Sequence, residues 1–128
     1  MKKIETVQKQ EKLNEVYAVD EKGNGGAYHR YVICKTGETN WSCGNNTLGL
    51  LEDIKFQNGA RKDQNSISGV LDTDLLEIVK HRLECFQEGE FSSEYNERAL
   101  HHVTEALRWM NKRIEDRIAR NVLGTNNK

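Results

Sequence analysis

Apolar residues are spaced differently in the front and back halves of the chain. Between residues 13 and 57 they stand in short runs of Val, Ile, Tyr and Leu separated by polar turns, which is typical of strands. Between residues 72 and 123 they recur at every third or fourth position, the repeat of an amphipathic helix. The pattern predicts an α+β protein, with a small N-terminal antiparallel β-sheet followed by two C-terminal α-helices.

Two runs in the front half, 13–20 and 27–35, predict an antiparallel hairpin. The segment between them, Glu-Lys-Gly-Asn-Gly-Gly, supplies glycines for the positive φ angles of a tight turn. A further strand is expected within 50–57. The polar stretch 36–46, rich in Gly, Asn, Thr and Ser, predicts a loop that carries an isolated Trp41.

The back half predicts two helices with defined ends. The first should begin with Asp72 as its N-cap and stop at Gly89. The second should be capped by Ser92 or Ser93, and Gly124 is placed to end it. The apolar stripe of the second helix is Leu100, Val103, Leu107, Met110, Ile114, Ile118 and Val122.

The length of the second helix bears on how the chain assembles. A helix of about 28 residues measures roughly 42 Å, more than the rest of a small domain easily covers. The stripe therefore favours self-association with another copy of the chain, although such a stripe also fits a monomeric core. With 128 residues the chain fits one domain, divided into a β-rich part at about 13–70 and a two-helix part at about 72–123.

Charge and composition exclude several classes of protein. The formal net charge is −1, without the basic excess of proteins that bind DNA or RNA non-specifically, so an anionic partner must meet a local cluster of cations. No run resembles a signal peptide or a membrane span, so a cytoplasmic protein without a membrane partner is expected. The three cysteines include no Cys-x-x-Cys pair, which argues against a disulfide scaffold or a zinc knuckle.

A strip of the second helix is the most interesting candidate surface. Trp109, Arg113 and Arg117 are spaced by four and share one side of the helix, with Arg120 near its end. Planar guanidinium groups fit the oxygens of a phosphate or pyrophosphate. The alternative is a solvated face on which Asp116 pairs with Arg113 or Arg120, and spacing alone favours that alternative.

Two other residues have a functional and an ordinary interpretation. The Phe86 ring, near the end of the first helix, can stack on a base or complete the core, and periodicity favours the core. Asn96 can contact a ribose or base edge, or be plain first-turn surface. The sequence contains no catalytic or phosphate-binding motif and no metal pattern among its four histidines, so neither an enzyme nor a cofactor is expected.

Many short segments in order resemble one family from about Tyr17 to Thr125. They include Gly-Gly-Ala-Tyr-His-Arg-Tyr at 25–31, Ile-Lys-Phe-Gln-Asn-Gly at 54–59 and Phe-Gln-Glu-Gly at 86–89. Single positions that follow in step are Asn96, Ala99, Leu100, Glu105, Ala106, Leu107, Trp109, Arg113, Arg117, Ala119, Arg120, Gly124 and Thr125. The chain thus resembles the first described family of phage Thoeris anti-defence proteins, the sponges of bacterial immune signals.

The resemblance implies a function and an assembly. Such proteins bind and hide, without degrading it, a glycocyclic ADP-ribose made by a defence enzyme with a TIR domain in the infected bacterial host cell. Relatives hold cyclic oligonucleotide signals in separate pockets. The resemblance also implies a small sheet with two C-terminal helices, packed as homodimers that assemble into hexamers.

By resemblance, four residues form the ligand site. Arg113 and Arg117 are assigned to the pyrophosphate, Phe86 to stacking on the base and Asn96 to polar contacts. Such charged hydrogen bonds contribute about 1.5–3 kcal/mol each in a dry pocket.

Other positions have a weaker or different assignment. Arg30 and Arg61 are weaker ligand candidates, the latter for a second, oligonucleotide site, while Trp109 is expected mainly to pack. The chain departs from the family's pattern after Asn58-Gly59, which puts the second site in doubt. It also carries Asn121 where glycine is typical, a milder change because Asn tolerates special turn geometry.

Two further hypotheses remain open. One is a small enzyme that degrades the same nucleotide signal, which would need a general base or metal that the sequence does not reveal. The other is a structural or regulatory phage protein whose helices pair with a host partner. Its melting temperature should not respond to cyclic nucleotides.

Overall fold

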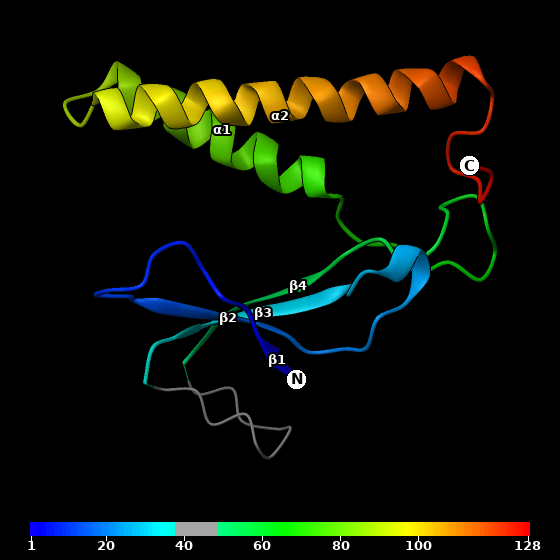
Figure 1. The fold of residues 1–128 in the computed structure, drawn as a ribbon, viewed down its shortest axis with the longest axis horizontal. Coiled ribbons are helices and arrows are strands. Elements are labelled where there is room, and N and C mark those ends of the chain that lie inside the picture. The colour runs from blue at the N-terminus through cyan, green and yellow to red at the C-terminus, as the bar shows by residue number, and fades with distance from the viewer. Residues whose placement is uncertain (38–48) are drawn as a thin grey trace. The chain divides into compact units, whose positions relative to one another are not determined.

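The computed structural model describes residues 1–37 and 49–128 (Figure 1). They form two compact units, one of Met1–Gly59 and Ile67–Gly69, the other of Ala60–Ser66 and Val70–Lys128. The first unit holds an antiparallel sheet and the second holds two helices, which confirms the predicted α+β class. Trp41 and most of the loop expected over 36–46 lie outside the described residues.

The sheet has four strands in chain order: β1 (Lys2–Lys3), β2 (Asn14–Ala18), β3 (Arg30–Lys35) and β4 (Leu50–Lys55). All neighbouring strands are antiparallel. The predicted hairpin is confirmed as β2 and β3, and the third expected strand as β4. β1 was not predicted, because two exposed lysines carry no alternating apolar pattern.

The sheet unit has few fully buried residues. Val32 and Cys34, two residues apart on β3, are fully buried on one face, and Ala18 on β2, which pairs with Tyr31, is fully buried on the other. The hairpin connection contains a short 3-10 helix, Asn24–Gly26. Gly25 and Gly26 adopt φ angles of 71° and 77°, the conformation expected of these glycines.

Both predicted helices are present, as α1 (Asp72–Glu88) and α2 (Glu94–Ala119). Ser93 caps α2, because its Oγ accepts a hydrogen bond from the Asn96 amide at 3.1 Å. The start of α1 differs from the prediction. Leu71 occupies the N-cap position, and the Asp74 carboxylate accepts a hydrogen bond from the Leu71 amide at 2.8 Å. The first turn is therefore stabilised from inside the helix, and Asp72 is its first residue.

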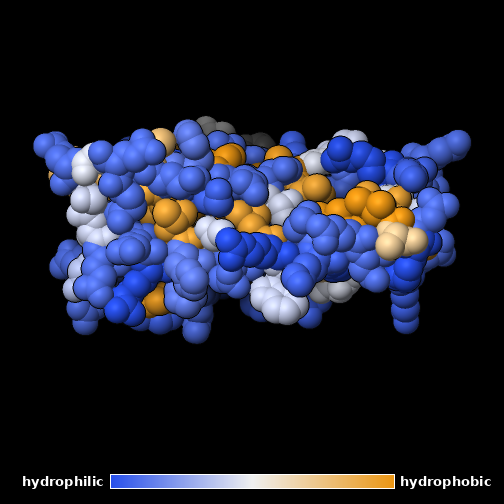
Figure 2. Space-filling view, turned by 90° about the horizontal axis from the view of Figure 1, so that it is seen from above, coloured by the Kyte–Doolittle hydropathy of each residue, from blue (hydrophilic) through white to orange (hydrophobic). Residues whose placement is uncertain are grey.

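The predicted apolar stripe of α2 is mostly half-buried. Leu107 is its most buried member, and Ile118 near the end of the helix is 58% exposed. α2 has 26 residues and α1 has 17, so α2 extends past α1 at its C-terminal end (Figure 1). Hydrophobic residues lie along the visible face between hydrophilic ones (Figure 2). None of the helices in the described part of the chain has the length and hydropathy of a membrane span.

The end of α2 is a Schellman motif built on Asn121. The Val122 amide donates to the Arg117 carbonyl and the Asn121 amide to the Ile118 carbonyl, both at 2.9 Å. Asn121 has a φ of 57°, in the left-handed region that glycine usually occupies at this position. The expectation that Asn121 tolerates the special turn geometry is confirmed.

The chain after this motif docks on the segment Ala60–Ser66 of the same unit. The Lys62 amide donates to the Gly124 carbonyl at 3.0 Å, and the Asn126 side chain donates to Asp63 at 3.3 Å. Gly124 has a φ of 75°, and a Cβ there would lie 3.2 Å from the Lys62 Cγ. The conformation of Gly124 thus favours glycine, and any other residue would also require the Lys62 side chain to shift.

Candidate functional site

Three arginines at or near α2 are neutralised by carboxylates one turn away. Their side chains form ion pairs at 2.6–2.9 Å, in the pairs Arg98–Glu94, Arg108–Glu105 and Arg120–Asp116. The pairing of Asp116 with Arg120, one of the alternatives expected from the sequence, is confirmed. Asp116 therefore does not compensate the charge of Arg113.

Arg113 and Arg117 lack such carboxylate partners. The exposed Arg113 forms no hydrogen bond or ion pair within the described parts of the chain. The half-buried Arg117 donates from Nη2 to the carbonyls of Val122 and Thr125, at 3.0 and 3.1 Å. Its charge is thus solvated by neutral carbonyls. Arg113 and Arg117 are thus one turn apart on α2, with their Cβ atoms about 5–6 Å from each other, and neither is paired with a carboxylate. Two such guanidinium groups can bind an anion.

Arg117 also has a structural role that the sequence did not reveal. Its Nη2 anchors the C-terminal tail through the two carbonyls, while Nε and Nη1 have no partner among the described residues. A bound anion can therefore be contacted by Arg117 only in part. Arg113 keeps all five N–H donors and is the less encumbered cation of the pair.

Phe86, near the end of α1, is 41% exposed, so its side chain is only partly covered within the chain. The Arg82 guanidinium carbon lies 5.5 Å from the centroid of its ring, a cation–π contact. Arg82 forms no ion pair in the described portions. The end of α1 thus presents an aromatic surface beside an uncompensated positive charge. Arg82 was missed from the sequence, because a single basic residue on a helix has many ordinary interpretations.

Asn96 lies at the start of α2 and takes part in the hairpin turn. Its backbone amide donates to Ser93, and its side-chain Nδ2 donates to the Phe91 carbonyl at 3.3 Å. Gln87 closes the turn from α1, with hydrogen bonds of 3.0 and 3.1 Å to the backbone of Ser93. Asn96 is therefore fixed in place by the turn, which leaves its Oδ1 as the atom suited to an external donor.

Trp109 corrects an expectation. It was expected mainly to pack, yet its side chain is 68% exposed. The Lys112 ammonium lies 5.3 Å from the ring centroid. Trp109 lies beside the apolar stripe in the sequence pattern, and this position alone could not show whether its ring is buried or exposed. The exposed ring lies one turn before Arg113, so an aromatic surface and an uncompensated cation are neighbours.

The predicted ligand residues of the helical unit fall into two groups. Phe86 and Asn96 flank the turn between the helices, whereas Arg113 and Arg117 lie near the other end of α2. Asn96 and Arg113 are about 25 Å apart along the helix axis at 1.5 Å per residue. One chain alone does not bring the two groups together.

The two weaker candidates belong to other segments of the chain. Arg30 belongs to the sheet unit, where Nε and Nη2 donate to the Asp53 carboxylate at 3.0 and 2.7 Å. These hydrogen bonds lower the pKa of Asp53 and raise the pKa of Arg30. Arg61 is exposed in the segment Ala60–Ser66 and is not an unpartnered cation.

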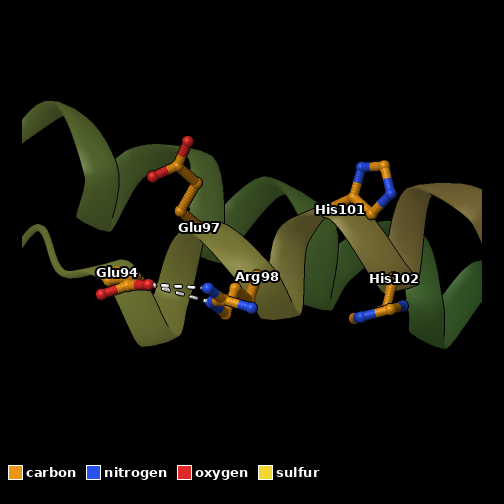
Figure 3. A pocket seen from close by; sticks show the side chains of 5 residues that line it. All are labelled: Glu94, Glu97, Arg98, His101 and His102. Atoms are coloured by element: carbon orange, nitrogen blue, oxygen red, sulfur yellow. Dashed lines mark hydrogen bonds and ion pairs between the residues drawn. The ribbon is translucent and has the colours of Figure 1, made fainter.

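An open hollow lies on the N-terminal half of α2 (Figure 3). Its lining residues are Glu94, Glu97, Arg98, His101 and His102. Arg98 is occupied by Glu94, and the rings of the adjacent histidines meet edge to face at 5.5 Å. Two carboxylates make this hollow a poor phosphate site, and none of the predicted ligand residues lines it. No three His, Cys, Asp or Glu side chains of the described residues are placed to hold a metal ion.

Comparison of the sequence with known proteins identifies the family of the chain. A family profile described as "Acb2/Tad1, hairpin domain" matches residues 50–115, more than half of the chain. The match covers β4, α1 and α2 as far as Glu115. The chain is also 39% identical over 80 residues to "Thoeris anti-defense 1" of Bacillus phage SBSphiJ7. That alignment spans 62% of this chain and 56% of the relative. The chain belongs to the Acb2/Tad1 hairpin-domain family.

Proposed function

We propose that this chain is a phage anti-defence protein that binds a cyclic ADP-ribose-type immune signal and keeps it from its effector. The observation that carries the proposal is the uncompensated Arg113–Arg117 pair on a helix whose other arginines are neutralised. Membership of a family with a relative named "Thoeris anti-defense 1" supports the anti-defence role. The proposed place of action is the cytoplasm of the infected host cell.

The residues suit the parts of a cyclised ADP-ribose such as glycocyclic ADP-ribose. Arg113, with a partial contribution from Arg117, meets the pyrophosphate through charged hydrogen bonds worth about 1.5–3 kcal/mol each. Phe86 stacks on the base, a contact worth about 1–3 kcal/mol, and Arg82 beside it adds positive charge. Asn96 contacts a ribose or base edge. These groups hold an anion without supplying a general base, so the proposed activity is sequestration without turnover.

The separation of the two groups supports a site shared by two chains. A compact cyclised nucleotide is far shorter than the roughly 25 Å between Asn96 and Arg113. If two copies pair antiparallel along α2, the turn of one chain lies beside the arginines of the other. A homodimer of this kind completes the site and covers the exposed apolar residues of α2, among them Ile118. The proposal extends to the assembly of such dimers into hexamers. It also extends to a second site, which includes Arg61 and binds cyclic oligonucleotides.

Thermal melting with glycocyclic ADP-ribose tests the binding, with NAD and linear ADP-ribose as controls. Ligand that binds the folded state raises its stability by about 2.7 kcal/mol at a hundredfold excess over the dissociation constant. We expect a clear rise in melting temperature with the cyclic ligand and little with the controls. No rise with the cyclic ligand, or an equal rise with all three, contradicts the proposal.

A further inference from the structure

The helix α1 carries a thiol and an imidazole that the proposed nucleotide contacts do not use. Cys85 and His81 are four residues apart, so their side chains lie on consecutive turns of the same helix face. The Cys85 Sγ lies 3.8 Å from the His81 Nε2. Both residues are exposed. Two metal-ligating atoms are thus held side by side at the surface by a regular helix.

The distance between the Cys85 sulfur and the His81 nitrogen is close to the distance between two ligands of one metal ion. Zinc binds thiolate sulfur at about 2.3 Å and imidazole nitrogen at about 2.0–2.1 Å, in tetrahedral geometry. Those bond lengths place the sulfur and the nitrogen about 3.6 Å apart. The observed separation therefore needs almost no movement of either side chain. We propose that Cys85 Sγ and His81 Nε2 form a two-ligand clamp for a borderline-soft divalent cation of the Zn²⁺ class.

The donor types determine which cations the clamp takes. Thiolate and imidazole favour Zn²⁺ and Co²⁺ over Mg²⁺ and Ca²⁺, which prefer oxygen ligands. Within the described residues no third His, Cys, Asp or Glu completes the set. The remaining coordination positions are therefore filled by water or by a ligand from outside the chain. The clamp is an open, exchangeable site, unlike the closed four-ligand sites that hold a fold together.

Other candidate ligands of the chain provide matched controls. His102 is also exposed on a helix, but the residues four positions before and after it are Arg98 and Ala106. It therefore has no thiol or carboxylate at the four-residue spacing of the clamp, and the carboxylate three residues further on, Glu105, is paired with Arg108. Cys34 is fully buried in the sheet and cannot reach a metal from solvent.

Titration of the reduced full-length chain with Co²⁺ tests the clamp. Binding through a thiolate produces a sulfur-to-cobalt charge-transfer band in the near ultraviolet, and competition with a coloured chelator gives the affinity. We expect the band in the wild type and in His102→Asn, and its loss in Cys85→Ser. Loss of even an outer-shell partner typically weakens metal binding about 10–100-fold, so His81→Asn should weaken it at least about tenfold.

A reciprocal variant separates the metal site from a general effect on folding. Cys85→His creates a pair of histidines at the same spacing, which should still bind Co²⁺ in the competition assay but lack the thiolate band. Circular dichroism should show equal helix content in all variants, because both positions are exposed. The proposal is overturned if the wild type shows no thiolate band, or if His81→Asn binds Co²⁺ as tightly as the wild type.

Discussion

Arg113 and Arg117 stand four residues apart on α2, yet they have different surroundings. Arg113 is exposed and unpartnered among the described residues, whereas Arg117 holds the C-terminal tail through Val122 and Thr125. Spacing alone makes the two arginines equivalent. The tertiary contacts distinguish them: we expect substitution of Arg117 to change stability as well as binding, so Arg113 is the cleaner probe.

Replacement of Arg113 by alanine should abolish binding of glycocyclic ADP-ribose without loss of stability. Alanine has the highest helix propensity, and Arg113 has no hydrogen bond or ion pair among the described residues to lose. Calorimetric titration and thermal melting measure the two effects. Arg108→Ala is the matched control, because Arg108 is equally part of α2 but paired with Glu105. If Arg113→Ala binds as the wild type does, the assignment of the site is wrong.

Arg117→Ala should lower the free energy of unfolding as well as ligand affinity. Two hydrogen bonds to carbonyls are removed, and a net contribution of about 0.5–1.5 kcal/mol per bond is typical. Urea denaturation measures the loss. An unchanged urea midpoint would show that the contacts to the tail do not stabilise the fold.

The ion pair of Arg30 and Asp53 links β3 to β4 and should make stability depend on pH. The pKa of Asp53 is lowered mainly by its hydrogen bonds from Arg30. Its contribution is therefore complete above the ordinary carboxyl pKa of about 3.9 and is lost as the pH falls through the lower folded-state pKa. Because Arg30 is 48% exposed, we expect Asp53→Asn to cost only about 0.2–1 kcal/mol at pH 7.

Melting of wild type and Asp53→Asn across this pH range tests the linkage. The difference in melting temperature should shrink as the pH falls below the ordinary carboxyl range. A difference that stays constant into strong acid would show that the carboxylate charge is not the source of the effect.

Patterns of individual residues indicated part of the candidate surface. The spacing of Trp109, Arg113 and Arg117 placed them on one strip, but it could not tell an exposed ring from a packed one. Arg82 stacks on Phe86 through side-chain geometry that no linear motif encodes. Such properties depend on which groups already have partners, and this information arises only in the folded chain.

The helices and the central hairpin were predictable because local interactions determine them. The end of α2 shows how far local rules extend, since a Schellman motif requires a left-handed residue and Asn121 supplies it. The strand β1 and the capping of α1 by Asp74 were not predicted. β1 depends on pairing with the distant β2, and the cap depends on one rotamer of a side chain inside the helix.

Substitution of Asn121 tests the geometry of this helix end. The left-handed conformation costs an ordinary L-residue about 1–2 kcal/mol, and least for Gly and Asn. We expect Asn121→Val to lower stability by about 1 kcal/mol or more, while Asn121→Gly changes it little. Both are measured by urea denaturation. Equal stability of the Val and Gly variants would contradict the motif.

The helical hairpin leaves apolar side chains of α2 exposed near the C-terminal end of that helix. Ile118, near the C-terminal end of α2, is 58% exposed. We expect sedimentation to show a homo-oligomer and Ile118→Glu to shift it toward monomer without loss of helix content. Ile78 on α1 is equally exposed, and Ile78→Glu serves as the control. An equal shift in both variants, or none in Ile118→Glu, contradicts an interface centred on α2.

The chemical fate of the ligand tests the central claim most directly. The protein is incubated with a slight molar deficit of glycocyclic ADP-ribose and filtered to remove free ligand. It is then denatured by heat, and the released material is analysed by mass spectrometry. A sponge returns the cyclic molecule intact and in near-stoichiometric amount, and Arg113→Ala retains none on the filter. Recovery of a hydrolysed product would show an enzyme, and ligand in the filtrate of the wild type would show that the chain does not sequester it.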